Sequence, residues 1–209
     1  MTSDTPTTDA AEDYLTEDDA LASARARGVM LGCPPVGPAC GAALRFLATI
    51  LRARAVVEIG TGAGVSGLYL LRGMCSDGVL TSIDVEPEHQ NAAKRAFTDG
   101  GIAPGRTRLI MGRALDVLPR LTDEAYDLLF VDAARAEYPS YHQQGVRLLR
   151  PGGVIAFDNV LRAGGVVNPA RQDAETRALR EVARAVRDDD RLTPVLLPLG
   201  DGLLVAAKT

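Results

Sequence analysis

The stretch from Ala55 to Leu71 constrains the fold of this chain more than any other. Its sequence, AVVEIGTGAGVSGLYLL, joins a mainly apolar run, Ala55 to Ile59, to a glycine turn and then to a helical pattern that begins at Val65. Glycine permits positive φ angles and lets a ligand lie against bare backbone at the start of a helix. The stretch therefore predicts a buried strand, a ligand-binding turn and a helix, in that order.

The glycine spacing alone leaves the ligand open. Gly62, Gly64 and Gly67 fit the G-x-G-x-x-G pattern of dinucleotide-binding loops, which is a weak signal by itself. Glu58 lies two residues before Gly60, and its carboxylate would repel a pyrophosphate. A long helical segment also precedes the loop, whereas dinucleotide domains often begin at this strand. Both features favour S-adenosylmethionine over NAD. An NAD-dependent oxidoreductase is kept as a less favoured hypothesis.

Length, charge and composition exclude several classes of protein. The chain has 209 residues, enough for one α/β domain, and its net charge of −4 argues against a nucleic-acid partner. It has no apolar run near the roughly 20 residues that span a membrane, and its polar N-terminus does not resemble a signal peptide. The three cysteines are scattered without a C-x-x-C pair. We therefore predict a cytoplasmic protein with reduced thiols and no membrane or nucleic-acid partner.

The first 52 residues form a segment of their own. Residues 1–13 are polar and acidic, which predicts a disordered tail. Two helices are predicted next, one from an N-cap at Thr16 to about Leu31 and one from Val36 to Leu51. The buried face predicted for the second helix consists of Ala39, Ala43, Phe46, Leu47 and Ile50. We predict one domain over 14–209, with 14–52 as a helical cap and 53–209 as the core.

From Ala55 onward strand and helix patterns alternate, which predicts a parallel sheet covered on both faces. The predicted parallel strands are Ala55–Ile59, Val79–Asp84, Thr107–Met111, Tyr126–Asp132 and Gly153–Asp158. An amphipathic helix is predicted over Ala174–Val186. Two further strands, Leu192–Leu197 and Leu203–Ala207, flank the hairpin signal Asp201-Gly202. The sheet is therefore predicted to end in an antiparallel pair.

Three of the predicted strands end in acids. Ligands of parallel sheets bind beyond the carboxyl ends of the strands. Asp84 ends the second strand, where a carboxylate can accept both ribose hydroxyls of an adenosine-containing ligand. Asp132 ends the fourth strand, and Asp158 and Asn159 end the fifth. Three oxygen ligands without His or Cys favour a hard cation such as Mg²⁺, although acids at such positions also cap turns.

With these motifs the chain resembles class I S-adenosylmethionine-dependent O-methyltransferases of the catechol and caffeoyl-CoA O-methyltransferase family, in particular its small bacterial members. The resemblance runs from about Asp18 to Lys208. The matching segments are VGPACG (36–41), EIGTGAGVS (58–66), SIDVEPEH (82–89), GRALDVLPRL (112–121), YDLLFVDA (126–133), LLRPGGVIAFDNVL (148–161) and LLPLGDGLLVAAK (196–208). It implies a Rossmann-like, doubly wound α/β fold whose seven-stranded sheet has the order 3-2-1-4-5-7-6 with strand seven antiparallel. A homodimer is implied as well.

The resemblance also implies a role for each matching residue. The residues implied to contact the methionine part of S-adenosylmethionine are Val36, Glu58, Gly60, Thr61 and Ser66, and Gly62 and Asp132 complete the predicted cofactor-binding set. Asp84 would bind the ribose, and Val85 and Ala114 would lie near the adenine. Asp132, Asp158 and Asn159 would bind the divalent metal.

One position departs from the family pattern. The family commonly has D-A-D-K after the fourth strand, with the Lys as general base, whereas this chain has Asp132-Ala133-Ala134-Arg135. A guanidinium stays protonated and cannot accept a proton. His142, one helical turn after Tyr138, is the other candidate base, although an exposed helical histidine is the favoured interpretation. Asp132, Arg135 and His142 are thus the predicted catalytic set.

These observations predict an enzyme that transfers the methyl group of S-adenosylmethionine to a hydroxyl of a small phenolic or catechol-like acceptor, with help from a divalent cation such as Mg²⁺. The alternative, which Arg135 supports, is a protein that binds S-adenosylmethionine with weak or no catalysis and acts as an interaction or regulatory module. The chain has only nine aromatic residues, five Tyr and four Phe, and no Trp, which leaves few side chains to hold a flat ring and keeps a non-aromatic acceptor open. Acceptor specificity is predicted in the N-terminal helices and in loop 162–173.

Overall fold

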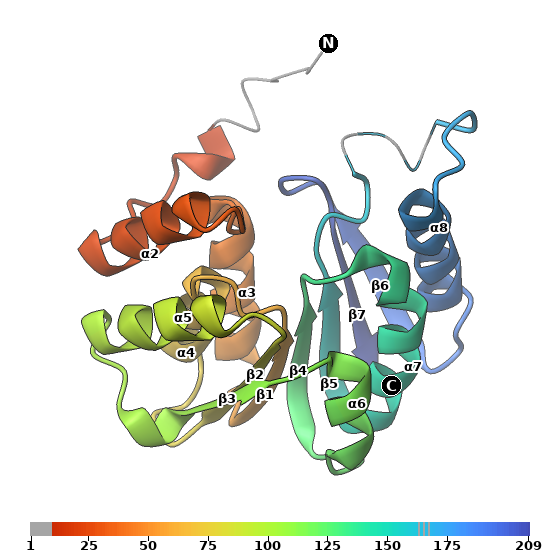
Figure 1. Cartoon of the computed structure of the whole chain (residues 1–209). Coiled ribbons are helices and arrows are strands. Elements are labelled where there is room, and N and C mark those ends of the chain that lie inside the picture. Colours follow the sequence, from red (N-terminus) through yellow and green to blue (C-terminus); the bar gives the residue numbers. More distant parts are fainter. Residues whose placement is uncertain (1–9, 163, 165, 167) are drawn as a thin grey trace.

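The computed structural model describes residues 10–162, 164, 166 and 168–209, and its centre is a seven-stranded sheet (Figure 1). The strands are β1 (Ala55–Ile59), β2 (Val79–Asp84), β3 (Thr107–Met111), β4 (Tyr126–Val131), β5 (Leu149–Phe157), β6 (Leu192–Leu197) and β7 (Leu203–Lys208). They lie in the order β3-β2-β1-β4-β5-β7-β6. β7 is antiparallel to β5 and β6, whereas the other pairs are parallel. The predicted fold class, strand order and antiparallel strand are confirmed.

Helices cover both faces of the sheet (Figure 1). One face carries α3 (Pro38–Ile50), α4 (Val65–Gly73) and α5 (Pro87–Asp99), with α2 (Asp19–Met30) packed on α5 and α4. The other face carries α6 (Ala114–Val117), α7 (Tyr138–Leu148) and α8 (Ala174–Arg187). In the described part of the chain, no helix has the length and apolar character needed to cross a membrane.

The strand β4 shows why both faces must be covered. Leu128 and Phe130 point into the core beneath α3, α4 and α5, whereas Leu129 and Val131 point into the core beneath α7 and α8. All four side chains are fully buried. A continuous apolar run of this kind is what a parallel strand buried on both faces requires.

Polar contacts tie the N-terminal helices to the core. Arg25 on α2 donates hydrogen bonds to the Glu17 carboxylate (Nη2 to Oε1, 2.6 Å) and to the carbonyl oxygen of Val36 (2.8 Å). The hydroxyl of Tyr69 on α4 donates to the same carboxylate at 2.9 Å. These contacts hold the segment between α2 and α3 above the glycine turn.

Two details of this segment differ from the predictions. Asp18, not Thr16, caps α2, because its carboxylate accepts a hydrogen bond from the Leu21 amide (3.1 Å). The predicted buried face of α3 is wrong at Phe46 and Ile50, which are 63% and 58% exposed. The residues of α3 that are buried are Ala39, Cys40, Gly41, Leu44 and Ala48.

Close packing between α3 and α4 explains which face of α3 is buried. A Cβ atom at Gly41 would lie 2.3 Å from the Tyr69 ring, and a Cβ atom at Gly73 would lie 2.3 Å from the Arg45 carbonyl oxygen. The helices approach each other through small residues and Leu44, which leaves Phe46 and Ile50 on the outer side of α3.

The tail and β5 also differ from the predictions. Residues 1–9 of the predicted disordered tail lie outside the described residues. Residues 10–12 are helical, and the Glu12 carboxylate accepts a hydrogen bond from the Ala39 amide at 3.0 Å. β5 begins at Leu149 rather than Gly153, and a register shift between Tyr126 and Leu128 of β4 accommodates the earlier start.

Candidate functional site

The candidate site lies at the carboxyl ends of β1, β4 and β5, with β2 beside them. Hydrogen bonds continue the parallel pairing one residue past the strands. The Asp132 amide donates to the Ile59 carbonyl and the Asp158 amide donates to the Val131 carbonyl, both at 2.9 Å. The chain therefore places Gly60, Asp132 and Asp158 next to one another at one edge of the sheet.

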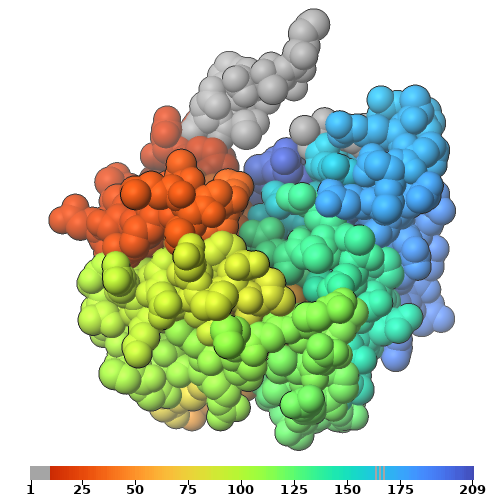
Figure 2. All heavy atoms as spheres, in the orientation of Figure 1, coloured from red at the N-terminus to blue at the C-terminus, as the bar shows by residue number. Residues whose placement is uncertain are grey.

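A cavity of about 620 Å³ opens over these strand ends. Figure 2 shows the surface hollowed between the orange N-terminal helices and the green-to-blue C-terminal half. This volume suits a small-molecule ligand. The predicted cofactor-binding residues that line the cavity are Val36, Gly60, Thr61, Gly62, Ser66, Asp84, Val85, Ala114 and Asp132. The predicted metal ligands Asp158 and Asn159 line it as well, and so does Arg135.

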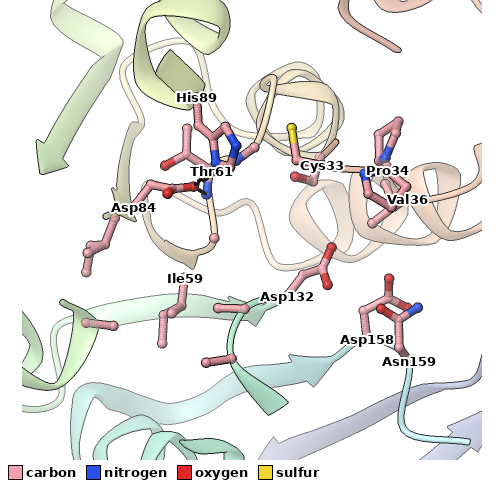
Figure 3. A pocket seen from close by; sticks show the side chains of 18 of the residues that line it. Cys33, Pro34, Val36, Ile59, Thr61, Asp84, His89, Asp132, Asp158 and Asn159 are labelled. Atoms are coloured by element: carbon pink, nitrogen blue, oxygen red, sulfur yellow. Dashed lines mark hydrogen bonds and ion pairs between the residues drawn. The ribbon is translucent and has the colours of Figure 1, made fainter. Parts of the chain in front are cut away.

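Asp84 holds the glycine loop in place. Its Oδ2 atom accepts hydrogen bonds from the amides of Thr61 (2.9 Å) and Gly62 (3.1 Å), and its Oδ1 atom accepts one from the Glu86 amide (2.9 Å). His89 Nδ1 lies 3.3 Å from Asp84 Oδ2, and Figure 3 shows the three side chains of Thr61, Asp84 and His89 together. The carboxylate thus joins the loop to the cavity wall.

Three glycines of the loop, Gly60, Gly62 and Gly64, have positive φ angles, and the first two differ in what surrounds them. Gly60 has a φ of 93° and Gly62 a φ of 47°. A Cβ atom at Gly60 would lie 1.9 Å from the Asp132 carbonyl oxygen, whereas a Cβ atom at Gly62 would meet nothing within 4 Å. Of Gly60 and Gly62, only Gly60 therefore requires the absence of a side chain on steric grounds.

Glu58 lies behind the loop and does not line the cavity. It is fully buried, and its carboxylate accepts hydrogen bonds from the hydroxyls of Ser66 (2.6 Å) and Ser82 (2.5 Å). Burial raises the pKa of Glu58 to about 7, and the two serine hydroxyls oppose that rise. The structure corrects the predicted direct contact with the ligand, because Glu58 is fully buried behind the loop and outside the cavity lining. Glu58 instead positions Ser66, which does line the cavity.

Replacement of Glu58 by glutamine should change how stability depends on pH. The folded-state pKa is about 7 and the ordinary value is 4.5, so the folded protein retains a proton that the unfolded chain releases. The part of the wild-type free energy of unfolding that Glu58 contributes should therefore fall, by about 3 kcal/mol, as the pH rises from about 4.5 to about 7. The raised pKa values of Asp132 and Asp158 add a further fall in the same range. Glu58→Gln cannot ionise, so denaturant titrations across that range should show a fall that is smaller than in wild type by the Glu58 part.

The matched control is Glu124→Gln, which neutralises a carboxylate that is 62% exposed. This variant should keep the wild-type dependence on pH. If Glu58→Gln and wild type showed the same slope, the pKa of Glu58 would not be raised in the folded protein.

The end of the cavity away from Asp84 carries paired acids. Figure 3 shows Asp132, Asp158 and Asn159 there. Burial raises the pKa of both aspartates, the charge of Asp132 raises that of Asp158 further, and Arg135 opposes the rise at Asp132. The Cys40 thiol lies 3.8 Å from Asp158 Oδ1. Burial raises the pKa of this thiol most, and the charge of Asp158 raises it further. A positive charge placed between the two carboxylates would therefore be stabilised.

Arg135 lies at the same end of the cavity. It begins the short η3 turn (Arg135–Glu137) that follows β4, and its Nη2 atom donates a hydrogen bond to Asn159 Oδ1 at 3.1 Å. Its Nη1 atom lies 3.9 Å from Glu175 Oε2 at the start of α8. Within the described residues, no group of three or more His, Cys, Asp and Glu side chains is placed to hold a metal ion. The predicted metal set contains two carboxylates and one amide.

His142 does not line the cavity, which corrects its place among the predicted catalytic residues. It is 7% exposed, and its Nε2 atom lies 3.5 Å from Asp189 Oδ2 on the far side of α7. Burial lowers the pKa of the imidazole, and Asp189 opposes that shift. The interpretation of His142 as an exposed helical residue is also wrong, because the apolar face of α7 includes it.

Several polar residues that line the cavity were not predicted from the sequence. Arg113 pairs with Glu137 (Nη2 to Oε1, 3.0 Å), and the Tyr141 hydroxyl donates to Glu137 Oε2 (2.5 Å) near Ala114. The four-residue spacing of Glu137 and Tyr141 on one helix face was an available signal. The other missed lining residues with polar or thiol groups are Cys33, Cys40, Glu86, His89 and Asp201. Residues 163, 165 and 167 of the predicted specificity loop lie outside the described residues.

Comparisons with known proteins identify the family of this chain. Residues 16–209 match the O-methyltransferase family. A relative from Mycolicibacterium vanbaalenii, provisionally named an O-methyltransferase, is 58% identical over 198 residues, which cover 95% of this chain and 88% of that protein.

An O-methyltransferase of Streptomyces achromogenes involved in tomaymycin synthesis, solved with S-adenosylmethionine, has a TM-score of 0.87 and 30% identity over 95% of this chain and 93% of its own. An O-methyltransferase of Bacillus cereus, solved with S-adenosylhomocysteine, has a TM-score of 0.87 and 27% identity over 96% and 95% of the two chains. The chain therefore belongs to the O-methyltransferase family, as its sequence motifs indicated.

Proposed function

We propose that this chain transfers the methyl group of S-adenosylmethionine to a hydroxyl oxygen of a small, catechol-like acceptor. The observation that carries the proposal is that one cavity holds the Asp84-bound glycine loop and, at its other end, the oxygen groups of Asp132, Asp158 and Asn159. The structural relatives solved with S-adenosylmethionine and S-adenosylhomocysteine support this choice of methyl donor.

The loop end of the cavity would hold the donor. The Asp84 carboxylate would accept hydrogen bonds from the ribose hydroxyls, and Val85 and Ala114 would contact the adenine. The methionine part would lie along the backbone of Gly60 and against Ser66, both of which line the cavity.

The acidic end of the cavity would hold the acceptor together with a divalent cation. Two buried carboxylates and an amide oxygen are the donors that Mg²⁺ prefers. Burial raises the pKa of Asp132 and Asp158, and the charge of Asp132 raises that of Asp158 further, so a bound cation would favour their ionised forms. When bound, such a cation lowers the pKa of a coordinated hydroxyl. Asp132, Asp158 and Asn159 would hold it.

Methyl transfer is a displacement at carbon. The acceptor oxygen attacks the methyl carbon in line with the carbon–sulfur bond, the new carbon–oxygen bond forms as the carbon–sulfur bond breaks, and the sulfonium becomes the thioether of S-adenosylhomocysteine. The hydroxyl proton leaves to solvent, because Arg135 cannot accept it and His142 does not line the cavity. The protein contributes by holding the two reacting atoms about 3–3.5 Å apart.

The direct test is a methyl-transfer assay. Purified protein with S-adenosylmethionine, Mg²⁺ and a panel of catechols, flavonoids and phenolic acyl-CoA esters should produce S-adenosylhomocysteine and a methylated acceptor, and excess EDTA should suppress turnover. Asp158→Ala should lose turnover while calorimetry finds its affinity for S-adenosylhomocysteine nearly unchanged. Tight S-adenosylhomocysteine binding without transfer to any acceptor would favour the alternative, a binding module without catalysis. Binding of NAD instead would favour an oxidoreductase.

Assembly and location are further parts of the proposal. The resemblance supports a homodimer, and α3 exposes the apolar side chains of Phe46 and Ile50 that such a contact needs. We also propose a single domain over 14–209 with a helical cap over 14–52, on the basis of the sequence patterns. A cytoplasmic location is proposed from the polar N-terminus and the scattered cysteines.

A further inference from the structure

The side chain of Arg135 touches one of the oxygens proposed to bind the cation. Its Nη2 atom donates to Asn159 Oδ1 at 3.1 Å, and its charge acts on Asp132. The guanidinium lines the cavity, and its side chain is 34% exposed. A guanidinium does not lose its proton in proteins. A permanent positive charge therefore lies where a divalent cation would need a free oxygen.

Arg135 also has a second partner within reach. Its Nη1 atom lies 3.9 Å from Glu175 Oε2, which is longer than a hydrogen bond, and the same carboxylate pairs with Arg162 at 3.1 Å. Among the described residues, Arg135 Nε has no hydrogen-bond partner. A short movement toward α8 would let the guanidinium bind Glu175 fully and leave Asn159 free.

The Asn159 side chain is shorter than that of Arg135 and has less reach. Its backbone is in the left-handed region, with a φ of 57°, directly after the buried Asp158. Asparagine tolerates this conformation better than most residues. Because the longer arginine side chain has the Glu175 carboxylate 3.9 Å away, a conflict between Arg135 and a cation would be relieved by movement of the arginine.

We propose that Arg135 competes with the divalent cation for Asn159 and swings to Glu175 when the cation binds. This inference rests on the proposed metal site. Arg135 would then be a positioning residue that lowers the affinity of the site for the cation, and cation binding would be linked to α8 through Glu175. The family Lys at this position lacks the planar fork that reaches an amide oxygen and a carboxylate together.

The test is calorimetric titration of Mn²⁺ into the full-length wild type and variants at neutral pH. Arg135→Met keeps much of the length without the charge and should bind Mn²⁺ at least about tenfold more tightly than wild type. Arg135→Lys keeps the charge but loses the planar fork, so its Mn²⁺ affinity should lie between those of wild type and Arg135→Met. The matched control is Arg113→Met, which removes another cavity arginine, paired with Glu137 at 3.0 Å. It should leave Mn²⁺ affinity unchanged.

A double-mutant cycle tests the movement itself. Glu175→Gln should weaken Mn²⁺ binding when Arg135 is present, because the displaced guanidinium loses its second partner. The same change should have no effect in Arg135→Met. Thermal unfolding of each variant shows whether it is folded. The variants at position 135 should fold, because the η3 turn that contains Arg135 has no buried residue.

Every outcome decides the proposal. Equal Mn²⁺ affinity of wild type and Arg135→Met would overturn the competition and leave the metal site standing. Absence of Mn²⁺ binding in all variants would overturn both, and methyl transfer in excess EDTA would then show that the transfer itself survives. Tighter binding by Arg135→Met without any methyl transfer would support the competition and count against the proposed enzyme.

Discussion

Gly60→Ala should lower the free energy of unfolding by more than about 4 kcal/mol and abolish measurable binding of S-adenosylhomocysteine. The new Cβ atom would lie 1.9 Å from the Asp132 carbonyl oxygen, and that carbonyl belongs to the backbone between β4 and η3. The φ of 93° adds conformational strain for any residue with a side chain. Relief would require β1 and β4 to separate at the cavity. Denaturant titration measures the first effect and calorimetry the second.

Gly62→Ala is the matched control in the same loop. Its φ of 47° is in the left-handed region, but a Cβ atom there meets no neighbour within 4 Å. The expected cost is about 1–2 kcal/mol from the backbone alone. If both alanine variants lost similar stability and similar affinity, the contact between Gly60 and Asp132 would not be what fixes the loop.

The core of the fold was predictable because its signals are local. The alternation of strand and helix patterns after Ala55 predicts a covered parallel sheet, and Asp201-Gly202 predicts the hairpin that ends it. Both agree with the structure. The strand order came from the family resemblance, since pairing between distant strands leaves no trace in local periodicity. The predicted start of β5 was too late, because Gly152 and Gly153 are typical of a turn. In the structure β5 continues through them, and a register shift in β4 lets Tyr126 pair with Leu149.

The direction of individual side chains was harder to predict. Glu58 precedes the glycine loop and so reads as a ligand contact, yet Ser66 and Ser82 take both of its oxygens inside the protein. His142 reads as a surface residue by its type, but α7 turns it inward against Asp189. Phe46 reads as core by its size, but the close approach of α3 to α4 excludes it. In each case a tertiary contact decides, and no neighbouring residue in the sequence reports it.

Asp132, Asp158 and Asn159 were predictable as a group because each ends a strand. Parallel pairing brings such ends to one edge of the sheet, which is what the hydrogen bonds beyond β4 and β5 do. The contact between Arg135 and Asn159 was not predictable in this way. It depends on the path of the η3 turn and on the left-handed backbone at Asn159.

Asp84→Ala should reduce the affinity for S-adenosylhomocysteine at least about 100-fold. The carboxylate receives amide hydrogen bonds from Thr61 and Gly62, and in the proposed function it also receives the ribose hydroxyls. Hydrogen bonds to a charged group contribute about 1.5–3 kcal/mol each, so the loss of two to the ligand accounts for this change before the loop relaxes. Calorimetric titration measures it directly, and a nearly unchanged affinity would remove Asp84 from the donor site.

Asp127→Ala is the control for this prediction, because Asp127 makes the same kind of contact elsewhere. Its Oδ2 atom accepts amide hydrogen bonds from Arg54 (2.7 Å) and Ala55 (2.9 Å), and its Oδ1 atom pairs with Arg150. It lies at the opposite end of β4 from Asp132, five residues and thus about 17 Å away. Asp127→Ala should lower stability as much as Asp84→Ala does, yet leave ligand affinity within about twofold of wild type, since distant sites act independently. A similar loss of affinity in both variants would mean that the sheet as a whole, rather than the carboxylate at the end of β2, holds the ligand.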